Sequence, residues 1–359
     1  MKVAYICNFS YPFWEGVWNN VYHLAKHMVK KGNEVHVFSS NLNPSGENFS
    51  RYELFEGIHL HRFPVKRKIG SYGLFFDFEK ELIKLGPDLI HAHVYRNPGA
   101  HKALAIAKKI KKPCFLTTHA PFSRKRSYLV GFFVKFYDFF YGNRILNSYK
   151  KVIAITNWEI PFLLSLGYRK EKIEYLPNGV DKEFFINIDN KKRNQAIYLG
   201  RVSEIKNLEI ITKIAKNFPN LSFKILGPKE KNYCLETESK NLQIIDKKFD
   251  KKDAIKFLKE SDIYILPSKS EGFPQTLLEA MASGKIVIAS ETKGALELIK
   301  EGKNGFIFYN LEDLHRKIRY CLDNFTKLKR LRKEAQETAR RFLWQNITKR
   351  TEELYKNEK

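Results

Sequence analysis

Short apolar runs alternate with segments of helical period from the beginning of the chain. Residues 3–7 form an apolar run of strand length, and residues 16–31 carry apolar side chains at helical spacing. Gly32 is expected to end this helix, because glycine suits the position after a helix C-terminus. The next predicted elements are strands at 34–39, 88–92, 114–118 and 152–156 and helices at 99–110 and 157–166. Repeated strand-helix-strand units predict a parallel sheet with helices on both faces.

A polar break separates this pattern from a second one of the same kind. The turn sequence at 177–179 and the polar stretch at 187–194 are typical of a domain boundary. Beyond it the sequence predicts strands at 196–199, 222–226, 263–266, 286–289 and 305–308, helices at 207–216, 252–260 and 275–283, and nearly continuous helix from 311. We therefore predict an α/β protein of two Rossmann-like domains facing across a cleft, with ligands at the C-terminal ends of the strands. The expected parts are 1–176, a linker at 177–194, 195–342, and a final helix at 343–359 that packs back on the first domain.

Composition narrows the class of protein. With 359 residues, 43% of them hydrophobic, the chain has enough apolar material for two cores, which excludes disordered, collagenous and disulfide-scaffold proteins. The four cysteines lie far apart, so neither a zinc ribbon nor a dense disulfide framework is expected. The formal net charge of +25 favours polyanionic partners: phosphorylated metabolites, an anionic membrane or nucleic acid.

The apolar stretches are too short for export or membrane spanning. The first run meets Asn8 and Pro12 before a signal-peptide core develops. The longest strongly apolar stretch, at 128–134, is far below the roughly 20 residues that a spanning helix needs. We expect a cytoplasmic protein that is either free or peripheral on the inner face of the membrane.

The sharpest motif is the seventeen-residue string from Ser268 to Gly284, which directly follows a predicted strand. It predicts a loop and then a helix, whose free N–H groups and dipole attract anions. Glu271 lies in the loop and Glu279 on the early helix. Carboxylates beside an anion site are favourable where they accept hydrogen bonds from neutral hydroxyls, such as those of a sugar or ribose. Either glutamate alone would be read as a solvated helix acid, but the whole string indicates a site.

This string resembles the signature of the retaining family-4 glycosyltransferases, which have the two-Rossmann GT-B fold. Other stretches resemble family segments in the same order: 11–17 with 24–25 and 32–35, 88–93, 117–119, 177–181, and Gly200-Arg201-Val202 with Lys206. Several ordered matches are much more specific than any single one.

The resemblance assigns roles to residues of the second half. Arg201 and Lys206 would hold the donor diphosphate, and a paired arginine and lysine suit a leaving pyrophosphate. Glu279 would bind the nucleotide ribose and Glu271 the transferred sugar. The sugar and phosphate pocket would be lined by Gly272, Phe273, Pro274, Gln275 and Thr276. The implied catalytic set is Glu271, Arg201, Lys206 and, from the first half, His119.

The resemblance also covers the first half, with one departure. Gly16 would let the backbone approach the donor phosphate, but the family usually has two glycines where this chain has Glu15-Gly16. His119 resembles the histidine that reaches the donor sugar, although a lone histidine is more often structural. We expect His91 and His93 to face opposite sides of their strand, with His93 toward the site on the acceptor side.

The resemblance implies transfer with retained anomeric configuration, in which the departing diphosphate oxygen accepts the acceptor's proton. The protein then mainly positions the substrates and stabilises the leaving group. No metal or other cofactor is expected, and the histidines lack carboxylate or cysteine partners at metal-ligand spacing.

A basic, aromatic segment has two interpretations. Arg124, Lys125 and Arg126 precede an aromatic run at 128–141, and a second basic cluster covers 66–68. A helix here would either lie in a lipid interface, held by anionic headgroups, or pack on the sheet with its basic start near the acceptor groove. The acceptor would be a saccharide or a lipid-linked sugar.

Two other functions share some of these features. The charge is compatible with a non-catalytic nucleic-acid-binding protein, but no zinc-finger, RNP or basic-zipper pattern is present, so no nucleic acid partner is expected. A nucleotide-sugar 2-epimerase would share the two-Rossmann architecture. The Gly-Arg…Lys and Glu-x7-Glu pairs, taken as a set, favour the glycosyltransferase.

Overall fold

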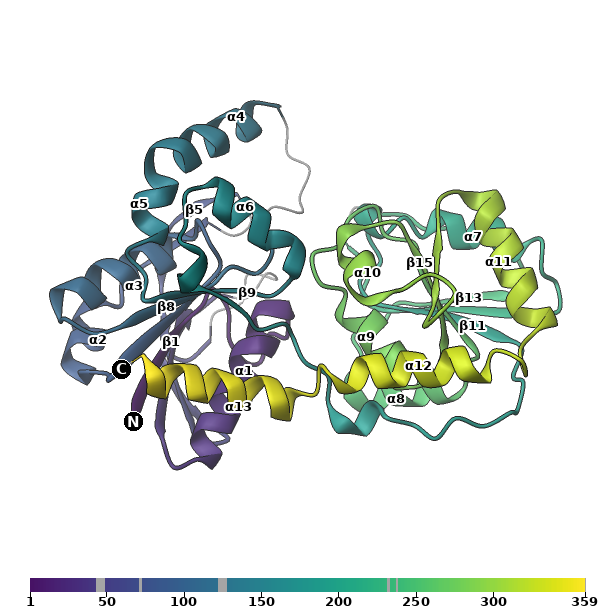
Figure 1. Cartoon of the computed structure of the whole chain (residues 1–359), viewed down its shortest axis with the longest axis horizontal. Coiled ribbons are helices and arrows are strands. Elements are labelled where there is room, and N and C mark those ends of the chain that lie inside the picture. Colours follow the sequence, from purple (N-terminus) through teal and green to yellow (C-terminus); the bar gives the residue numbers. More distant parts are fainter. Residues whose placement is uncertain (43–48, 71–72, 122–127, 231–232, 237, 359) are drawn as a thin grey trace. The chain divides into compact units, whose positions relative to one another are not determined.

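The computed structural model describes residues 1–358 except 43–48, 71–72, 122–127, 231–232 and 237. The chain forms two compact units (Figure 1). Unit 1 comprises Met1–Asn178 and Trp344–Lys359, and unit 2 comprises Gly179–Leu343. Most of the segment expected as a linker therefore belongs to unit 2. Val180 and Phe184 are buried in the core of that unit, which explains why the turn at 177–179 ends the first unit but does not begin a free linker.

Unit 1 is built on an eight-stranded sheet in the order β10-β9-β8-β7-β1-β2-β4-β3. All neighbours are parallel except β3 and β4, and a separate antiparallel pair joins β5 and β6. The strands are β1 (Lys2–Ile6), β2 (Glu34–Ser40), β3 (Tyr52–Phe55), β4 (Ile58–Phe63), β5 (Val65–Ile69), β6 (Gly73–Phe76), β7 (Leu89–His93), β8 (Cys114–Thr117), β9 (Lys151–Ala154) and β10 (Ile173–Tyr175). The parallel core of this sheet is the one that the apolar runs predict.

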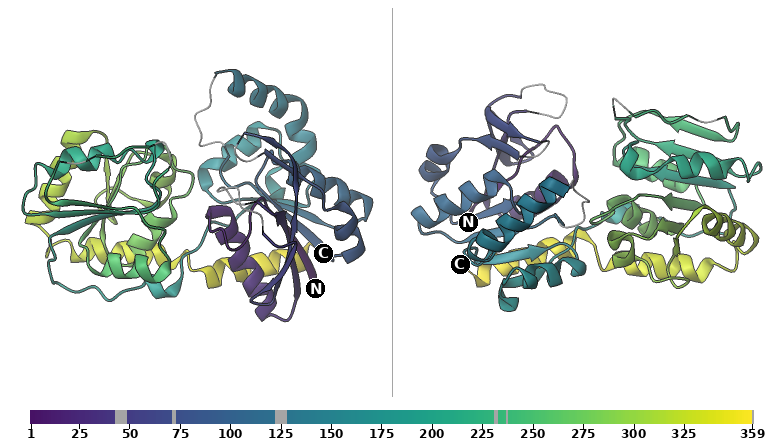
Figure 2. Two further views of the ribbon diagram at one scale, coloured as in Figure 1. Left: turned by 180° about the vertical axis from the view of Figure 1, so that it is seen from behind. Right: turned by 90° about the horizontal axis from the view of Figure 1, so that it is seen from above.

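Two apolar cores cover the two faces of this sheet. Alternate residues of β1 divide between them: Val3 and Tyr5 join one core, and Ala4 and Ile6 join the other. The first core includes α1 (Gly16–Lys30) and α13 (Trp344–Asn357), which lie side by side (Figures 1 and 2). The other helices are α2 (Glu79–Leu85), α3 (Pro98–Lys109), α4 (Tyr128–Tyr137), a π-helical turn (Asp138–Gly142), α5 (Asn143–Leu146) and α6 (Ile160–Ser165), with 3₁₀ turns at Asn157–Glu159 and Lys170–Lys172.

Unit 2 has a six-stranded, all-parallel sheet in the order β13-β12-β11-β14-β15-β16. Its strands are β11 (Gln195–Leu199), β12 (Ser222–Leu226), β13 (Leu242–Ile245), β14 (Ile263–Leu266), β15 (Ile286–Ser290) and β16 (Phe306–Phe308). Its helices are α7 (Glu209–Ala215), α8 (Lys251–Lys259), α9 (Gln275–Ala282), α10 (Lys293–Leu298), α11 (Leu311–Asp323) and α12 (Lys329–Arg340), with 3₁₀ turns at Lys182–Phe184 and Glu204–Lys206. Helices cover both faces of the sheet (Figure 2). The strands β11, β14, β15 and β16 are buried along almost all of their length, which explains their continuous apolar runs.

The C-terminal region is three helices and not one nearly continuous helix. α11 ends at Asp323, α12 ends at Arg340, and α13 begins at Trp344, where the chain returns to unit 1. Within unit 1, Tyr355 of α13 is fully buried and its hydroxyl contacts Nδ1 of His91 at 2.5 Å. The end of the chain is thus part of the core of unit 1.

Candidate functional site

The string from Ser268 to Gly284 folds as the sequence predicts. β14 ends at Leu266, the loop follows, and α9 begins at Gln275 directly after Pro274. Leu277, Leu278 and Met281 are fully buried on the inner face of α9, and Gly284 takes a positive φ just after the helix. The loop that carries Glu271 therefore lies at the C-terminal end of a central parallel strand.

Lys206 and Glu271 meet at this end of the sheet. The Lys206 ammonium lies 2.7 Å from Oε1 of Glu271, and the Ser268 hydroxyl donates to the same oxygen at 2.6 Å. The two charged side chains are only 18% and 11% exposed, so the pair is far better shielded from water than a surface ion pair. Each residue fixes the position of the other, and the pair places a cation and a hydroxyl-binding carboxylate side by side.

Arg201 follows β11 and is held loosely. Its guanidinium donates to Glu230 at 3.2 Å, and both side chains are more than half exposed. An exposed ion pair of this kind contributes little stability, so the arginine can exchange Glu230 for an anionic ligand at small cost. The backbone here is tightly constrained, because a Cβ on Gly227 would lie 1.8 Å from the carbonyl oxygen of Gly200.

Glu279 has an unusual ionisation. Burial raises the pKa of its carboxyl to about 8; the Gln275 side chain opposes this shift by hydrogen bonding, while nearby Asp181 adds to it. Asp181 itself contacts Lys251 at 3.1 Å. Sequence reasoning missed Asp181 and Lys251 as neighbours of the site, although Asp181 lies within the 177–181 stretch that resembles the family.

Two buried tyrosines lie among the predicted donor residues of unit 2. Burial is the main cause that raises the pKa of Tyr198. The charge of Glu271 raises it further, and the charge of Arg201 lowers it. Burial also raises the pKa of Tyr264, and the charges of Glu271 and Glu279 raise it further. The structure therefore gathers all four predicted charged residues, Arg201, Lys206, Glu271 and Glu279, around the C-terminal ends of β11 and β14.

The neighbours of Glu271 in the loop and helix are used partly by the fold itself. The Gln275 amide donates to the carbonyl of Gly179 at 2.6 Å, and the Thr276 hydroxyl lies 2.7 Å from the Tyr264 hydroxyl. Phe273 packs against Phe342. These side chains are therefore engaged within unit 2, and the predicted lining of the sugar and phosphate pocket by Gly272, Phe273, Pro274, Gln275 and Thr276 stays a prediction.

In unit 1, His119 follows β8 and contacts His93. Nε2 of His119 lies 2.9 Å from Nδ1 of His93. Burial lowers the pKa of His119 to about 3 and also lowers that of His93, so both rings are neutral near pH 7. His119 can therefore act as a neutral hydrogen-bonding group.

The expectation that His91 and His93 face opposite sides is wrong. Their rings stack with centroids 4.3 Å apart, because residues two apart on a strand point to the same face. His93 is buried and contacts His119, so it is not exposed on a surface that an acceptor could reach directly. His91 is held by Thr117 and Tyr355 and is a core residue.

Sequence reasoning also missed Glu159, which organises the turn that carries His119. Its buried carboxyl accepts hydrogen bonds from the Thr118 hydroxyl at 2.5 Å and the Ala120 amide at 3.0 Å. It also accepts from the Ile155 amide and from Thr156. His119 and Ala120 have φ values of 59° and 51°, a left-handed conformation that costs energy in non-glycine residues. The Thr156-x-x-Glu159 capping box was the readable signal.

Replacing Glu159 with alanine is expected to lower the free energy of unfolding by about 2–4 kcal/mol, because several buried donors lose their acceptor. Urea unfolding at constant pH measures this effect. Burial raises the Glu159 pKa to about 7, so its contribution to stability is complete below its unfolded pKa near 4.5 and declines as pH rises through 7. The exposed Glu171→Ala serves as control; equal stability of the two variants would contradict the role.

Gly16 begins α1, and the space that a Cβ would fill is open. The packing of unit 1 therefore does not require glycine there, and its role toward a donor phosphate stays a prediction. Arg124, Lys125 and Arg126 lie outside the described residues.

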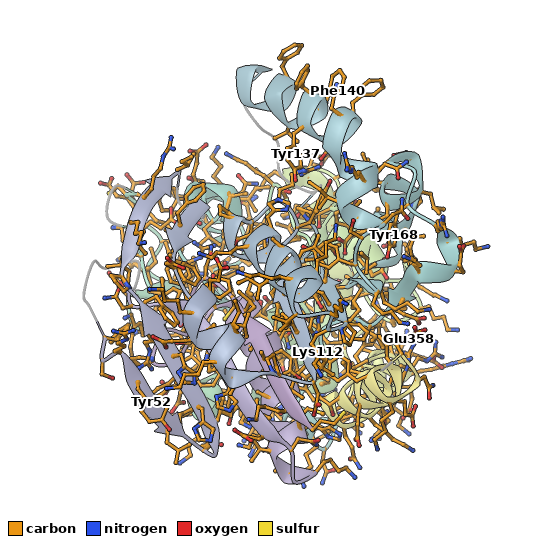
Figure 3. The ribbon with its side chains drawn as sticks, turned by 90° about the vertical axis from the view of Figure 1, so that its left-hand side faces the viewer. Tyr52, Lys112, Tyr137, Phe140, Tyr168 and Glu358 are labelled. Carbon is orange, nitrogen blue, oxygen red and sulfur yellow. The ribbon has the colours of Figure 1, made fainter. Side chains whose placement is uncertain are left out.

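The aromatic segment forms α4 and the π-helical turn after it, and its side chains divide between two faces. Phe132, Phe136, Phe139 and Phe140 are 59%, 51%, 79% and 57% exposed, at a spacing that forms one helical stripe. Tyr137 turns the other way, toward His101, while Phe140 points away from the body of unit 1 (Figure 3). The interpretation as a core helix thus holds for one face only.

Within the described parts of the chain, we find no group of three or more histidine, cysteine or carboxylate side chains placed to hold a metal ion. A search of the same residues finds no helix whose length and apolar character would suffice to cross a membrane.

Two α/β units with parallel sheets are the GT-B architecture, and the comparisons with known proteins show which class of GT-B protein this is. The sequence-family model described as "Glycosyltransferase Family 4" matches residues 14–184. A second family model, "Glycosyl transferases group 1", matches residues 180–338. Together they span most of the chain, which belongs to the family-4 glycosyltransferases.

Several relatives align over nearly their whole length. An uncharacterised glycosyltransferase of Methanocaldococcus jannaschii is 25% identical, over 96% of this chain and 95% of the relative. The alpha-monoglucosyldiacylglycerol synthase of Acholeplasma laidlawii is 22% identical, over 99% and 96%. Among solved structures, HepE of Anabaena in complex with UDP and glucose superposes with a TM-score of 0.74 at 17% identity, covering 99% of this chain and all of HepE. At this identity the structural likeness shows the fold alone.

Proposed function

We propose that the protein transfers a sugar, with retained anomeric configuration, from a nucleoside-diphosphate sugar to a lipid-linked or saccharide acceptor at a membrane surface. The observation that carries this proposal is the shielded Lys206–Glu271 pair at the end of β14. In this proposal the Lys206 ammonium acts on the leaving diphosphate, and the Glu271 carboxylate beside it accepts hydrogen bonds from sugar hydroxyls. A nucleic-acid-binding protein would not need a shielded carboxylate beside the cation, and the family models favour a transferase over an epimerase of similar fold.

In the proposed reaction, unit 2 binds the donor. Arg201 and Lys206 neutralise the two phosphates, and Glu271 accepts hydrogen bonds from the transferred sugar. Glu279 accepts from the ribose hydroxyls. That HepE binds UDP supports a nucleotide donor, by analogy of fold.

The chemical step we propose needs little from the protein beyond charge and position. The bond between the anomeric carbon and the diphosphate oxygen breaks while the acceptor oxygen bonds to the same face of the sugar. The proton of the acceptor hydroxyl passes to the departing diphosphate oxygen. The cations stabilise the negative charge that develops there, so we propose that no metal is required. The neutral His119 would hydrogen-bond the sugar without adding charge.

A donor screen tests this function directly. The protein is incubated with individual UDP-, GDP- and ADP-sugars without acceptor, and the released sugar is identified by mass and anomeric form. Slow hydrolysis of one donor, with the anomer retained, supports the proposal. An inverted product would contradict the retaining mechanism, and turnover to an epimer would favour the epimerase.

Donor binding is expected to depend on pH through Glu279. The ribose-bound form we propose is the carboxylate, whereas the free carboxyl has a pKa of about 8. Affinity for the nucleoside diphosphate should therefore rise with pH up to about 8 and then level off. Calorimetric titrations between pH 6 and 9 measure this, and Glu279→Gln should flatten the rise. The same slope in both proteins would contradict the assignment.

The proposal for the acceptor is based on the phenylalanine stripe. This stripe comprises Phe132, Phe136, Phe139 and Phe140 on α4 and the π-helical turn that follows it. Exposed aromatic rings beside basic residues are typical of helices that lie in a lipid interface, and the relative in Acholeplasma laidlawii is named for a glycolipid product. We therefore propose peripheral binding to anionic membrane.

Vesicle sedimentation checks the membrane proposal. The protein should sediment with anionic but not neutral vesicles and be released by high salt. Phe139→Ser with Phe140→Ser should weaken vesicle binding about tenfold or more, because two large apolar side chains no longer enter the interface. Phe162→Ser, a change at a half-exposed phenylalanine of α6, is the control. Equal binding to both vesicle types, or to neither, would discard the interface.

A further inference from the structure

Unit 1 contains a pocket that none of the roles above uses. It has a volume of about 700 Å³ and lies between the β5–β6 pair, the start of α3 and α4. Its walls are formed largely by Phe75, Phe76, Val134 and Tyr137, with Lys66 and Lys102 among the polar lining residues. This volume is in the range of about 300–1,000 Å³ that is typical of ligand pockets.

A second hollow continues the first along α3. It has a volume of about 390 Å³, shares His101 and Tyr137 with the first, and is otherwise lined by Leu104, Ala105, Lys108 and Ile145. The Tyr137 hydroxyl contacts Nε2 of His101 at 2.9 Å, so the main polar groups at the junction satisfy each other. The two hollows together therefore offer a ligand a continuous surface that is mostly apolar.

α4 connects this pocket to the phenylalanine stripe. Val134 and Tyr137 line the pocket from one side of the helix, while Phe132, Phe136 and Phe140 are exposed on the other. Figure 3 shows Tyr137 directed toward the body of unit 1 and Phe140 directed outward. One helix therefore presents one face to the pocket and the other to solvent.

The charge near the pocket is positive. Lys66 and Lys102 both pair with the single carboxylate of Asp77, at 3.3 and 2.5 Å, so one positive charge remains uncompensated within this trio. Arg67 and Lys68 of β5 are exposed beside it, and Arg67 stacks over Phe75. An apolar pocket beside several cations complements an apolar chain that carries an anionic group.

We propose that this pocket binds the hydrocarbon chain of an anionic lipid, with the lipid phosphate held by Lys66 and Lys102. Only the further step, that this lipid carries the acceptor group, rests on the proposed function. The pocket is also lined by Arg96 and His101. Arg96 is paired with Asp138 and His101 with the Tyr137 hydroxyl. A free sugar or nucleotide would have to displace these partners, whereas a hydrocarbon chain needs only the apolar walls. An anionic lipid should bind more tightly than a neutral one, because only the anionic headgroup gains from the charges of Lys66 and Lys102.

Binding of monomeric lipid tests the proposal separately from membrane binding. The probe is a lysophosphatidic acid with a saturated chain, used below its micellar concentration and titrated calorimetrically into the full-length protein. We expect saturable binding of one lipid per chain and weaker binding of lysophosphatidylcholine. Val134→Trp fills the pocket and should weaken binding about tenfold or more, since chain carbons are excluded. Leu164→Trp, at an exposed leucine of α6 outside the pocket and the phenylalanine stripe, should leave it within about twofold.

Two further variants keep the outcome decisive. Lys66→Ala with Lys102→Ala should abolish the preference for the anionic probe. Phe75→Asp places a carboxylate beside the chain and should weaken binding even if Val134→Trp does not fold. Equal affinities of all variants for lysophosphatidic acid, or binding that does not saturate, would overturn the proposal that the pocket binds lipid. Nucleotide binding is measured in the same preparations: a protein that binds a nucleoside diphosphate but not the lipid refutes only the pocket, and the reverse refutes only the proposed function.

Discussion

Replacing Lys206 with alanine is expected to lower kcat/KM for sugar transfer about 10²–10³-fold, the usual loss when one pre-placed group that stabilises developing negative charge is removed. Lys206 is shielded and fixed by Glu271 at 2.7 Å, so its charge acts on the leaving diphosphate in a poorly hydrated setting. The loss should appear mainly in kcat, because the charge on the diphosphate grows in the transition state. Steady-state kinetics with the donor identified by the hydrolysis screen measures both constants.

Lys269→Ala is the matched control for this variant. Lys269 lies in the same loop region and pairs with Glu204 at 3.3 Å, but it is half exposed. Its replacement should change kcat/KM by no more than about twofold, as expected for a surface charge. If Lys206→Ala and Lys269→Ala behave alike, the cation does not act on the leaving group.

The second large effect is expected at Glu271. Glu271→Gln should lower kcat/KM about ten- to a hundredfold, because an amide cannot replace a carboxylate that accepts charge-assisted hydrogen bonds from sugar hydroxyls. Binding of the nucleoside diphosphate without sugar should not weaken, since the variant releases Lys206 from its ion pair. Comparing affinities for the diphosphate and for the complete nucleotide sugar separates these two contributions.

The control for Glu271→Gln is Glu204→Gln, at the exposed partner of Lys269. In addition, Lys206→Ala with Glu271→Gln should cost less than the two single losses combined, because the residues contact each other. Weakened binding of the bare diphosphate in Glu271→Gln would place the carboxylate near phosphate and contradict its assignment to the sugar.

Most strands of the two parallel sheets were predictable from the sequence, but the parallel strands β4, β10 and β13 and the antiparallel strands of unit 1 were not. Buried parallel strands such as β1 and β14 read as continuous apolar runs because both faces are covered. In contrast, β3 and β5 are largely exposed, and β4 contains Arg62, which is buried only because Glu53 and several oxygens surround it. The exposed strands β3 and β5 have no apolar run to mark them, and the alternation of β4 is interrupted at Arg62, whose burial depends on partners distant in sequence.

The site shows the same division. Glu271, Lys206 and Arg201 were found because each follows a strong strand signal or motif, and their mutual placement follows from the parallel sheet. Glu159 was missed because its importance depends on five donors supplied from two separate turns. The error over His91 and His93 was to place residues two apart on a strand on opposite faces. The side chains of a strand repeat every two residues, so these two share a face.

The most direct test of the account is the thermal stability of the protein with UDP, GDP and ADP. One nucleoside diphosphate should raise the Tm of the wild-type protein in a concentration-dependent manner. The rise should vanish when Arg201→Ala and Lys206→Ala are combined and persist in Lys269→Ala. The account is contradicted if no diphosphate changes the Tm, or if the doubly substituted protein responds as the wild type does.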